Sequence, residues 1–63
     1  MLRLTIRKKD GEFCVRVTAY CAVTGRTKLH QEYFTPDRDD ANGTADAIVA
    51  ENRALGFEII DRR

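Results

Sequence analysis

The sequence predicts a single small α+β domain over residues 1–63, in which one helix packs on one face of an antiparallel sheet. Three observations lead to this prediction. Three segments alternate between apolar and polar residues, a later segment has apolar residues at helical spacing, and a short apolar segment follows it. The expected order is β-β-β-α-β, which is a three-stranded antiparallel meander, then the helix, then a short C-terminal fourth strand.

The first two strands are predicted at residues 2–7 and 12–22. In both, apolar residues recur at every second position, which is the pattern of a strand with one buried face. Asp10 and Gly11 lie between the two strands. This pair predicts a tight hairpin turn, because glycine accepts the positive φ that the turn requires.

A third strand is predicted at residues 27–34, after a turn at residues 23–26 that contains Gly25. Alternation divides its side chains between the two faces of the sheet. The side chains expected to face the core are Leu29, Gln31 and Tyr33. Those expected to face solvent are Lys28, His30 and Glu32.

A helix is predicted over residues 45–55, where apolar residues recur at spacings of three and four and Gly56 marks the end. Its start is left open between Thr35 and Thr44. Within that interval, Thr35, Asp40 and Thr44 are each suitable N-cap residues.

The segment Phe57–Ile60 predicts the fourth strand, parallel to a neighbour at an edge of the sheet. The apolar sides of the predicted strands and helix together define the expected core. Its members are Leu2, Leu4, Ile6, Phe13, Val15, Val17, Ala19, Leu29, Tyr33, Ile48, Val49, Leu55, Phe57 and Ile59.

Length and composition restrict the class of protein. No apolar run approaches the roughly 20 residues that span a bilayer, and the first residues alternate rather than form the apolar block of a signal peptide. A cytoplasmic protein without membrane contact is therefore expected. Cys14 and Cys21 are expected to be free thiols, because seven residues of strand hold them beyond disulfide reach. Cys14 is expected to be exposed.

Charge is distributed unevenly along the chain. Residues 1–34 carry seven basic and three acidic side chains, a net charge of +4, whereas residues 35–63 carry four and seven, a net charge of −3. Such a division favours one molecular face that attracts anions.

Enzymatic chemistry finds little support, and the chain is predicted not to be an enzyme. His30 has no acid–base partner at a telling spacing, and Cys14 has no neighbouring base that would lower its pKa. Two cysteines and one histidine do not make a four-ligand zinc site. Asp37, Asp39 and Asp40 fit the first turn of a helix better than a calcium loop. No cofactor and no metal are expected.

The sheet face opposite the helix is the more informative candidate site. It is expected to present arginines, threonines and one aromatic ring, with further cations in the turns at its ends. Such a face can contact phosphates and base edges in the major groove of double-stranded DNA. The expected nucleic-acid-binding residues are Arg3, Arg7, Arg16, Thr18, Tyr20, Arg26 and Lys28. The alternative is that these residues only solvate the outer side of a sheet.

Three segments carry a resemblance to a known family: Gly11–Arg16, Thr24–Arg26 and Ala47–Asn52. Together they resemble the amino-terminal arm-site DNA-binding domain of phage lambda-type tyrosine integrases. The resemblance covers roughly residues 11–55. It implies a three-stranded sheet placed in the major groove, with Arg7, Arg16, Thr18 and Lys28 facing DNA. Unlike that family, this chain is expected to add a fourth strand after the helix, has no recombinase domain and is less basic.

A protein-interaction module is the competing interpretation. In size only, the chain is similar to small accessory proteins of phages and mobile elements, which block host protein complexes, including defence complexes. Tyr20 and Arg16 are residue types common in interface hot spots. An exposed strand edge, with Phe57–Ile60 as the expected one, could pair with another chain, including a second copy in a homodimer.

Overall fold

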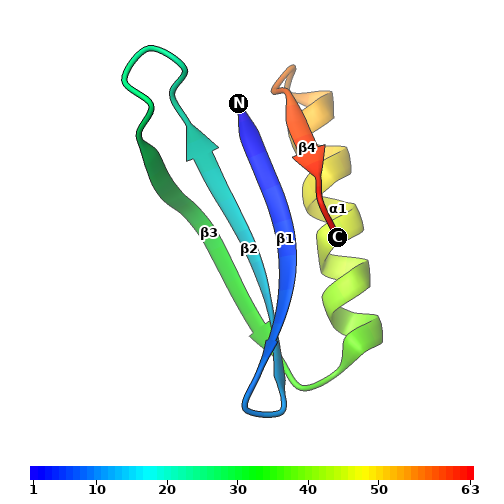
Figure 1. The fold of residues 1–63 in the computed structure, drawn as a ribbon. Helices are drawn as coiled ribbons and strands as arrows, with labels where there is room; N and C mark the ends of the chain where they lie inside the picture. Colours follow the sequence, from blue (N-terminus) through cyan, green and yellow to red (C-terminus); the bar gives the residue numbers. More distant parts are fainter.

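The computed structural model describes residues 1–63 as one sheet and one helix (Figure 1). The elements are β1 (Leu2–Lys9), β2 (Glu12–Tyr20), β3 (Thr27–Thr35), α1 (Arg38–Ala54) and β4 (Ile59–Asp61). The strands lie in the order β3-β2-β1-β4, antiparallel between β3, β2 and β1 and parallel between β1 and β4. This confirms the predicted α+β class and the β-β-β-α-β order.

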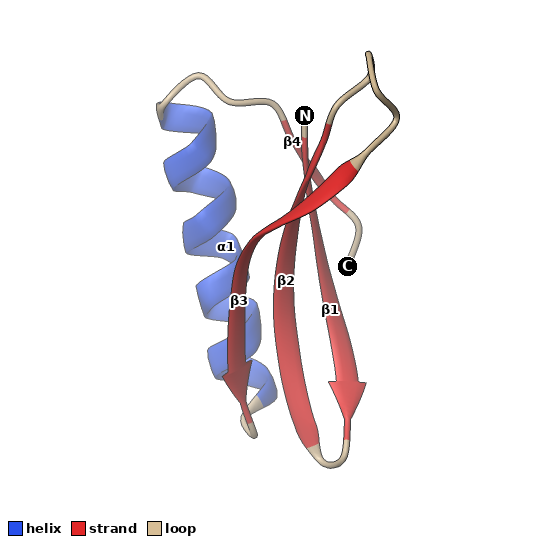
Figure 2. Cartoon of the chain, turned by 90° about the vertical axis from the view of Figure 1, so that its left-hand side faces the viewer, coloured by secondary structure: helices blue, strands red, loops and turns tan.

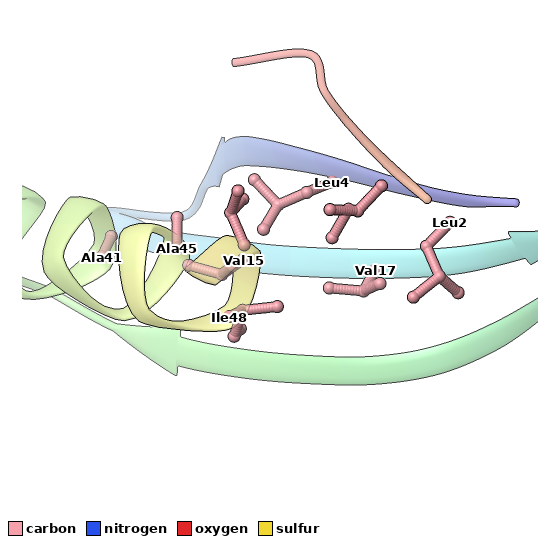
Figure 3. Close-up of a cluster of buried hydrophobic side chains, with 9 residues drawn as sticks. Leu2, Leu4, Val15, Val17, Ala41, Ala45 and Ile48 are labelled. Atoms are coloured by element: carbon pink, nitrogen blue, oxygen red, sulfur yellow. The ribbon is translucent and has the colours of Figure 1, made fainter. Parts of the chain in front are cut away.

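The molecule has two layers, because α1 covers one face of the sheet and leaves the other open (Figure 2). The core lies between them and consists of nine buried side chains, seven of which are labelled in Figure 3. Its members are Leu2, Leu4, Val15, Val17, Ala41, Ala45, Ile48, Val49 and Ile59. Ala41 and Ala45 are completely buried, and their small side chains let α1 lie close to β2.

The β1–β2 hairpin is the most regular part of the sheet. Its register runs without interruption from Leu2 opposite Ala19 to Lys9 opposite Glu12. Asp10 and Gly11 form the turn with φ values of 53° and 79°, both in the left-handed region. The hairpin turn expected from the Asp-Gly pair is thereby confirmed.

β3 contains a bulge that the alternating pattern does not reveal. Val17 lies opposite Gln31 and Thr18 opposite Leu29, so His30 is an extra residue without a partner on β2. Beyond the bulge the faces are exchanged. Lys28 lies opposite Ala19, on the helix side, while Leu29 shares the open side with Thr18 and is 50% exposed. The predictions that Leu29 faces the core and Lys28 the open face are therefore wrong.

The N-terminus of α1 is capped by Asp37, whose carboxylate accepts a hydrogen bond from the backbone N–H of Asp39 at 2.9 Å. The helix therefore begins within the interval left open, but at none of the three proposed caps. The Thr35 hydroxyl instead accepts from the Asp37 N–H at 3.2 Å. The Asp40 carboxylate accepts from the Tyr33 hydroxyl at 2.6 Å, which ties β3 to the first turn of α1.

Gly56, at φ 86°, ends the helix as predicted. The backbone N–H of Gly56 donates to the Arg53 carbonyl at 3.0 Å, and that of Phe57 donates to the Asn52 carbonyl at 2.9 Å. These two bonds form a Schellman motif and keep Phe57 in the turn rather than in a strand. The prediction of a strand from Phe57 is wrong, because β4 begins only at Ile59.

Four of the predicted core residues are exposed. Leu55 and Phe57, at the C-terminal turn of α1, have exposed fractions of 73% and 57%. Tyr33 is 38% exposed and points its hydroxyl at Asp40, and Leu29 lies on the far side of the sheet. The other predicted core residues are buried or pack against the buried cluster.

Arg63 ties the residues after β4 to α1. Its guanidinium donates to the Asp46 carboxylate at 2.7 Å and, through Nε, to the Asp61 carboxylate at 2.9 Å. This contact holds the pKa of Asp61 below its usual value. The helix lacks the length and apolar character that crossing a membrane requires.

Candidate nucleic-acid interface

The sheet face turned away from α1, here called the open face, is defined by the strand register. On β1 and β2, three cross-strand pairs share it: Arg3 with Thr18, Thr5 with Arg16, and Arg7 with Cys14. The next rows add Tyr20 of β2, Leu29, Glu32 and Phe34 of β3, and Ile60 of β4.

Five of the seven residues predicted to bind nucleic acid share this face. They are Arg3, Arg7, Arg16, Thr18 and Tyr20. Arg26 is exposed in the loop between β2 and β3. Lys28 lies on the helix side of the sheet, because the β3 bulge exchanges the faces of the residues that precede His30. The structure therefore concentrates the candidate set on the β1–β2 hairpin.

Arg3 is held against the sheet by an aromatic ring. Its guanidinium carbon lies 5.0 Å from the centroid of the Tyr20 ring, a cation–π contact. Its Nε is buried and has no hydrogen-bond partner. The ion pairs of the molecule involve only Arg16 and Arg63, so the charges of Arg3 and Arg7 have no carboxylate partner.

Arg16 is the one open-face arginine with a carboxylate neighbour. Its Nη2 lies 3.6 Å from Oε2 of Glu32, a long separation for an ion pair. Its Nε, like that of Arg3, is buried without a partner. Turning the Arg16 guanidinium away from Glu32 toward an incoming anion therefore costs little free energy.

The prediction that Cys14 is exposed is wrong. Cys14 belongs to the open face, but only 8% of it is exposed. Its Sγ donates to Glu32 Oε2 at 3.6 Å. Burial is the main cause of a raised pKa at this thiol, and the Glu32 contact raises it further. A thiol of this kind stays protonated near neutral pH and is a poor nucleophile.

Two hollows lie at the hairpin end of the open face, and Lys9, Cys14 and Phe34 line both. The first, of about 360 Å³, has Arg7 and Arg16 among its walls. The second, of about 340 Å³, has Asp10 and Glu12 instead. Phe34 thus borders one cationic hollow and one acidic hollow.

Phe34 is the open-face residue that the predicted binding set omits. It is 59% exposed and lies opposite Cys14 in the register. The signal for it was present in the sequence, since Phe34 follows Glu32 by two positions and therefore shares its face. Leu29 could not be found this way, because the bulge exchanges the faces.

His30 and the acidic residues do not assemble into a metal-binding cluster. No group of three His, Cys, Asp or Glu side chains lies in an arrangement that could hold a metal ion. His30 is exposed at the bulge, and Asp37, Asp39 and Asp40 belong to the first turn of α1 or its cap.

No protein-family model matches this chain, and no curated protein and no solved structure matches it either. The resemblance to the arm-site domain of lambda-type integrases stays a prediction.

Proposed function

We propose that this chain is a non-enzymatic binding module that binds nucleic acid, with double-stranded DNA as the expected polymer, through the open face. One observation carries the proposal. Arg3, Arg7 and Arg16 lie on adjacent strands of one face, and two of these three arginines have no carboxylate partner.

The dimensions of the β1–β2 hairpin support a duplex as the ligand. Arg3 and Arg7 are four residues apart on one strand, which corresponds to about 13 Å at roughly 3.3 Å per residue. A two-stranded ribbon fits the major groove, which is about 12 Å wide. Within the groove, an arginine can donate two hydrogen bonds to guanine, and Thr5 or Thr18 can reach either base of a pair.

The distribution of charge across the two layers also favours a complex in which the open face, and not the helix, is turned toward the DNA. The acidic second half of the chain supplies α1, which carries Asp46 and Glu51 on exposed positions behind the sheet. A polyanion is therefore attracted to the open face and repelled from the helix layer. Both effects present the β1–β2 hairpin to the duplex.

The salt dependence of binding tests the proposal. We expect micromolar binding of a fluorescent random-sequence duplex at low salt, measured by anisotropy. If the three arginines each neutralise one phosphate, log K falls against log salt with a slope of about −2.7, or about 40-fold between 50 and 200 mM. A chain that binds no duplex at 50 mM salt would contradict the proposal.

A protein-interaction module is the second candidate, and the β3 edge is the observation that favours it. β3 is a nine-residue edge strand with exposed Leu29, Tyr33 and Phe34 side chains. Another chain could add a strand there, either a host protein or a second copy. The bulge at His30 works against it, because bulges protect sheet edges from pairing. Sedimentation at high concentration distinguishes a homodimer from a monomer.

A further inference from the structure

We infer that the cationic hollow beside Phe34 receives one unpaired base, so that the open face binds single-stranded nucleic acid more tightly than a fully paired duplex. This inference rests on the proposed function, since it concerns the same face. It names the form of the polymer that the face prefers.

The exposed ring of Phe34 is the first observation. More than half of this side chain is open to solvent, 59%, on a strand whose neighbouring open-face residue is Glu32. An aromatic ring on a sheet surface is a stacking platform for a base, and every base has the flat face that such stacking needs. In a paired duplex the bases are stacked on each other, so only an unpaired base can use the ring.

The second observation is the charge of the hollow itself. Seven residues line it, of which four are basic and one, Glu32, is acidic. Glu32 already accepts from the Cys14 thiol and lies beside Arg16, so part of its charge is compensated. Its volume of about 360 Å³ falls within the range typical of small-molecule sites. An aromatic wall with cations beside it suits a base with its phosphate.

The positions of Asp10 and Glu12 determine the direction in which the sugar–phosphate backbone of a bound nucleic acid runs. Phe34 also borders the second hollow, where Asp10 and Glu12 would repel a phosphate. A nucleotide stacked on Phe34 therefore directs its phosphate toward Arg7 and Arg16. From there the nucleic-acid strand can continue along β1 and β2 to Arg3, which is stacked on Tyr20.

The experiment compares three labelled DNAs of equal length by anisotropy at one salt concentration: a single strand, a paired duplex, and the same duplex with one unpaired base. We expect the wild-type protein to prefer the DNAs that offer an unpaired base. Phe34→Ala should lose this preference and bind the single strand roughly 5- to 150-fold more weakly, the change expected for one stacked base. Phe34→Trp should keep the preference, because an aromatic ring is retained.

Leu29→Ala is the matched control. Leu29 is on the same strand and the same face and is exposed to a similar degree, but it does not line the hollow. This variant should keep the preference for an unpaired base. Equal binding of all three DNAs by the wild type, with no effect of Phe34→Ala, would overturn this inference and leave the proposed function standing. Failure to bind any of the three DNAs would overturn both.

Discussion

At the scale of single residues, the two cysteines show how local surroundings give identical side chains different thiol pKa values. Cys14 is buried, and its pKa is raised mainly by that burial. Cys21 is exposed in the loop after β2, and hydrogen bonds from Thr24 and from the Val23 backbone lower its pKa. Near neutral pH the thiolate is therefore more populated at Cys21 than at Cys14.

This contrast predicts that a thiol-reactive dye labels the protein in one fast step, at Cys21, followed by a slow step at Cys14. Cys21→Ser should remove the fast step, and Cys14→Ser should leave it intact. Time-resolved labelling at pH 7.5 measures both rates. A fast step that survives in Cys21→Ser would show that the Cys14 thiol is accessible and would contradict its burial.

At the scale of elements, the sequence specifies the faces and the turn of the β1–β2 hairpin, but not its strand ends. β1 runs two residues beyond its predicted end, and β2 stops two residues before its own. Strict alternation fixes which side chains face the core, and the Asp-Gly pair fixes the turn. The helix end at Gly56 is equally well specified. Its start is not, because the stretch Thr35–Thr44 offers several acidic or hydroxyl residues that could cap it, and backbone geometry selects Asp37.

The faces of β3 could not be predicted, because a bulge adds a residue without any signature in the hydrophobic pattern. Once His30 is unpaired, every residue before it changes face, which moves Lys28 and Leu29 together. The error in the C-terminal segment has a different cause. Phe57 resembles the first residue of a strand, but the Schellman motif at the end of α1 uses its N–H.

A pair of substitutions tests the β3 register. Val17 is completely buried, so Val17→Ala should reduce the free energy of unfolding by about 1–3 kcal/mol. In a domain of this size that corresponds to a melting temperature lowered by at least about 4 °C. Leu29→Ala removes a half-exposed side chain on the open face and should cost less than about 1 kcal/mol.

Thermal unfolding followed by circular dichroism measures both variants. An unchanged melting temperature for Val17→Ala would mean that the buried face of β2 is assigned incorrectly. If Leu29→Ala lowers the melting temperature as much as Val17→Ala does, Leu29 belongs to the core and β3 has no bulge at His30.

At the scale of the whole molecule, the division of charge along the chain becomes a division between two layers. The basic first half forms β1, β2 and β3, and the acidic second half supplies the helix behind them and the short edge strand β4. The sequence predicted most of the open face for this reason, because charge and alternation agree on β1 and β2. It did not reveal the hollows beside Phe34, which depend on how β3 pairs with β2.

We expect nucleic acid to bind the open face in particular, and not to be attracted by the net charge of the whole protein. The affinity of two charge-reversed variants for a DNA duplex tests this expectation, because the two variants have the same net charge. Arg7→Glu with Arg16→Glu changes the open face, and Lys28→Glu with Arg53→Glu changes the helix side. Circular dichroism first establishes that both variants are folded.

At low salt, where electrostatic contributions to nucleic-acid binding are largest, we expect the open-face variant to lose detectable binding. The helix-side variant should bind within a few-fold of the wild-type affinity. Equal weakening of the two folded variants would mean that only net charge attracts the polymer. Unchanged affinity in the open-face variant would contradict the proposed interface.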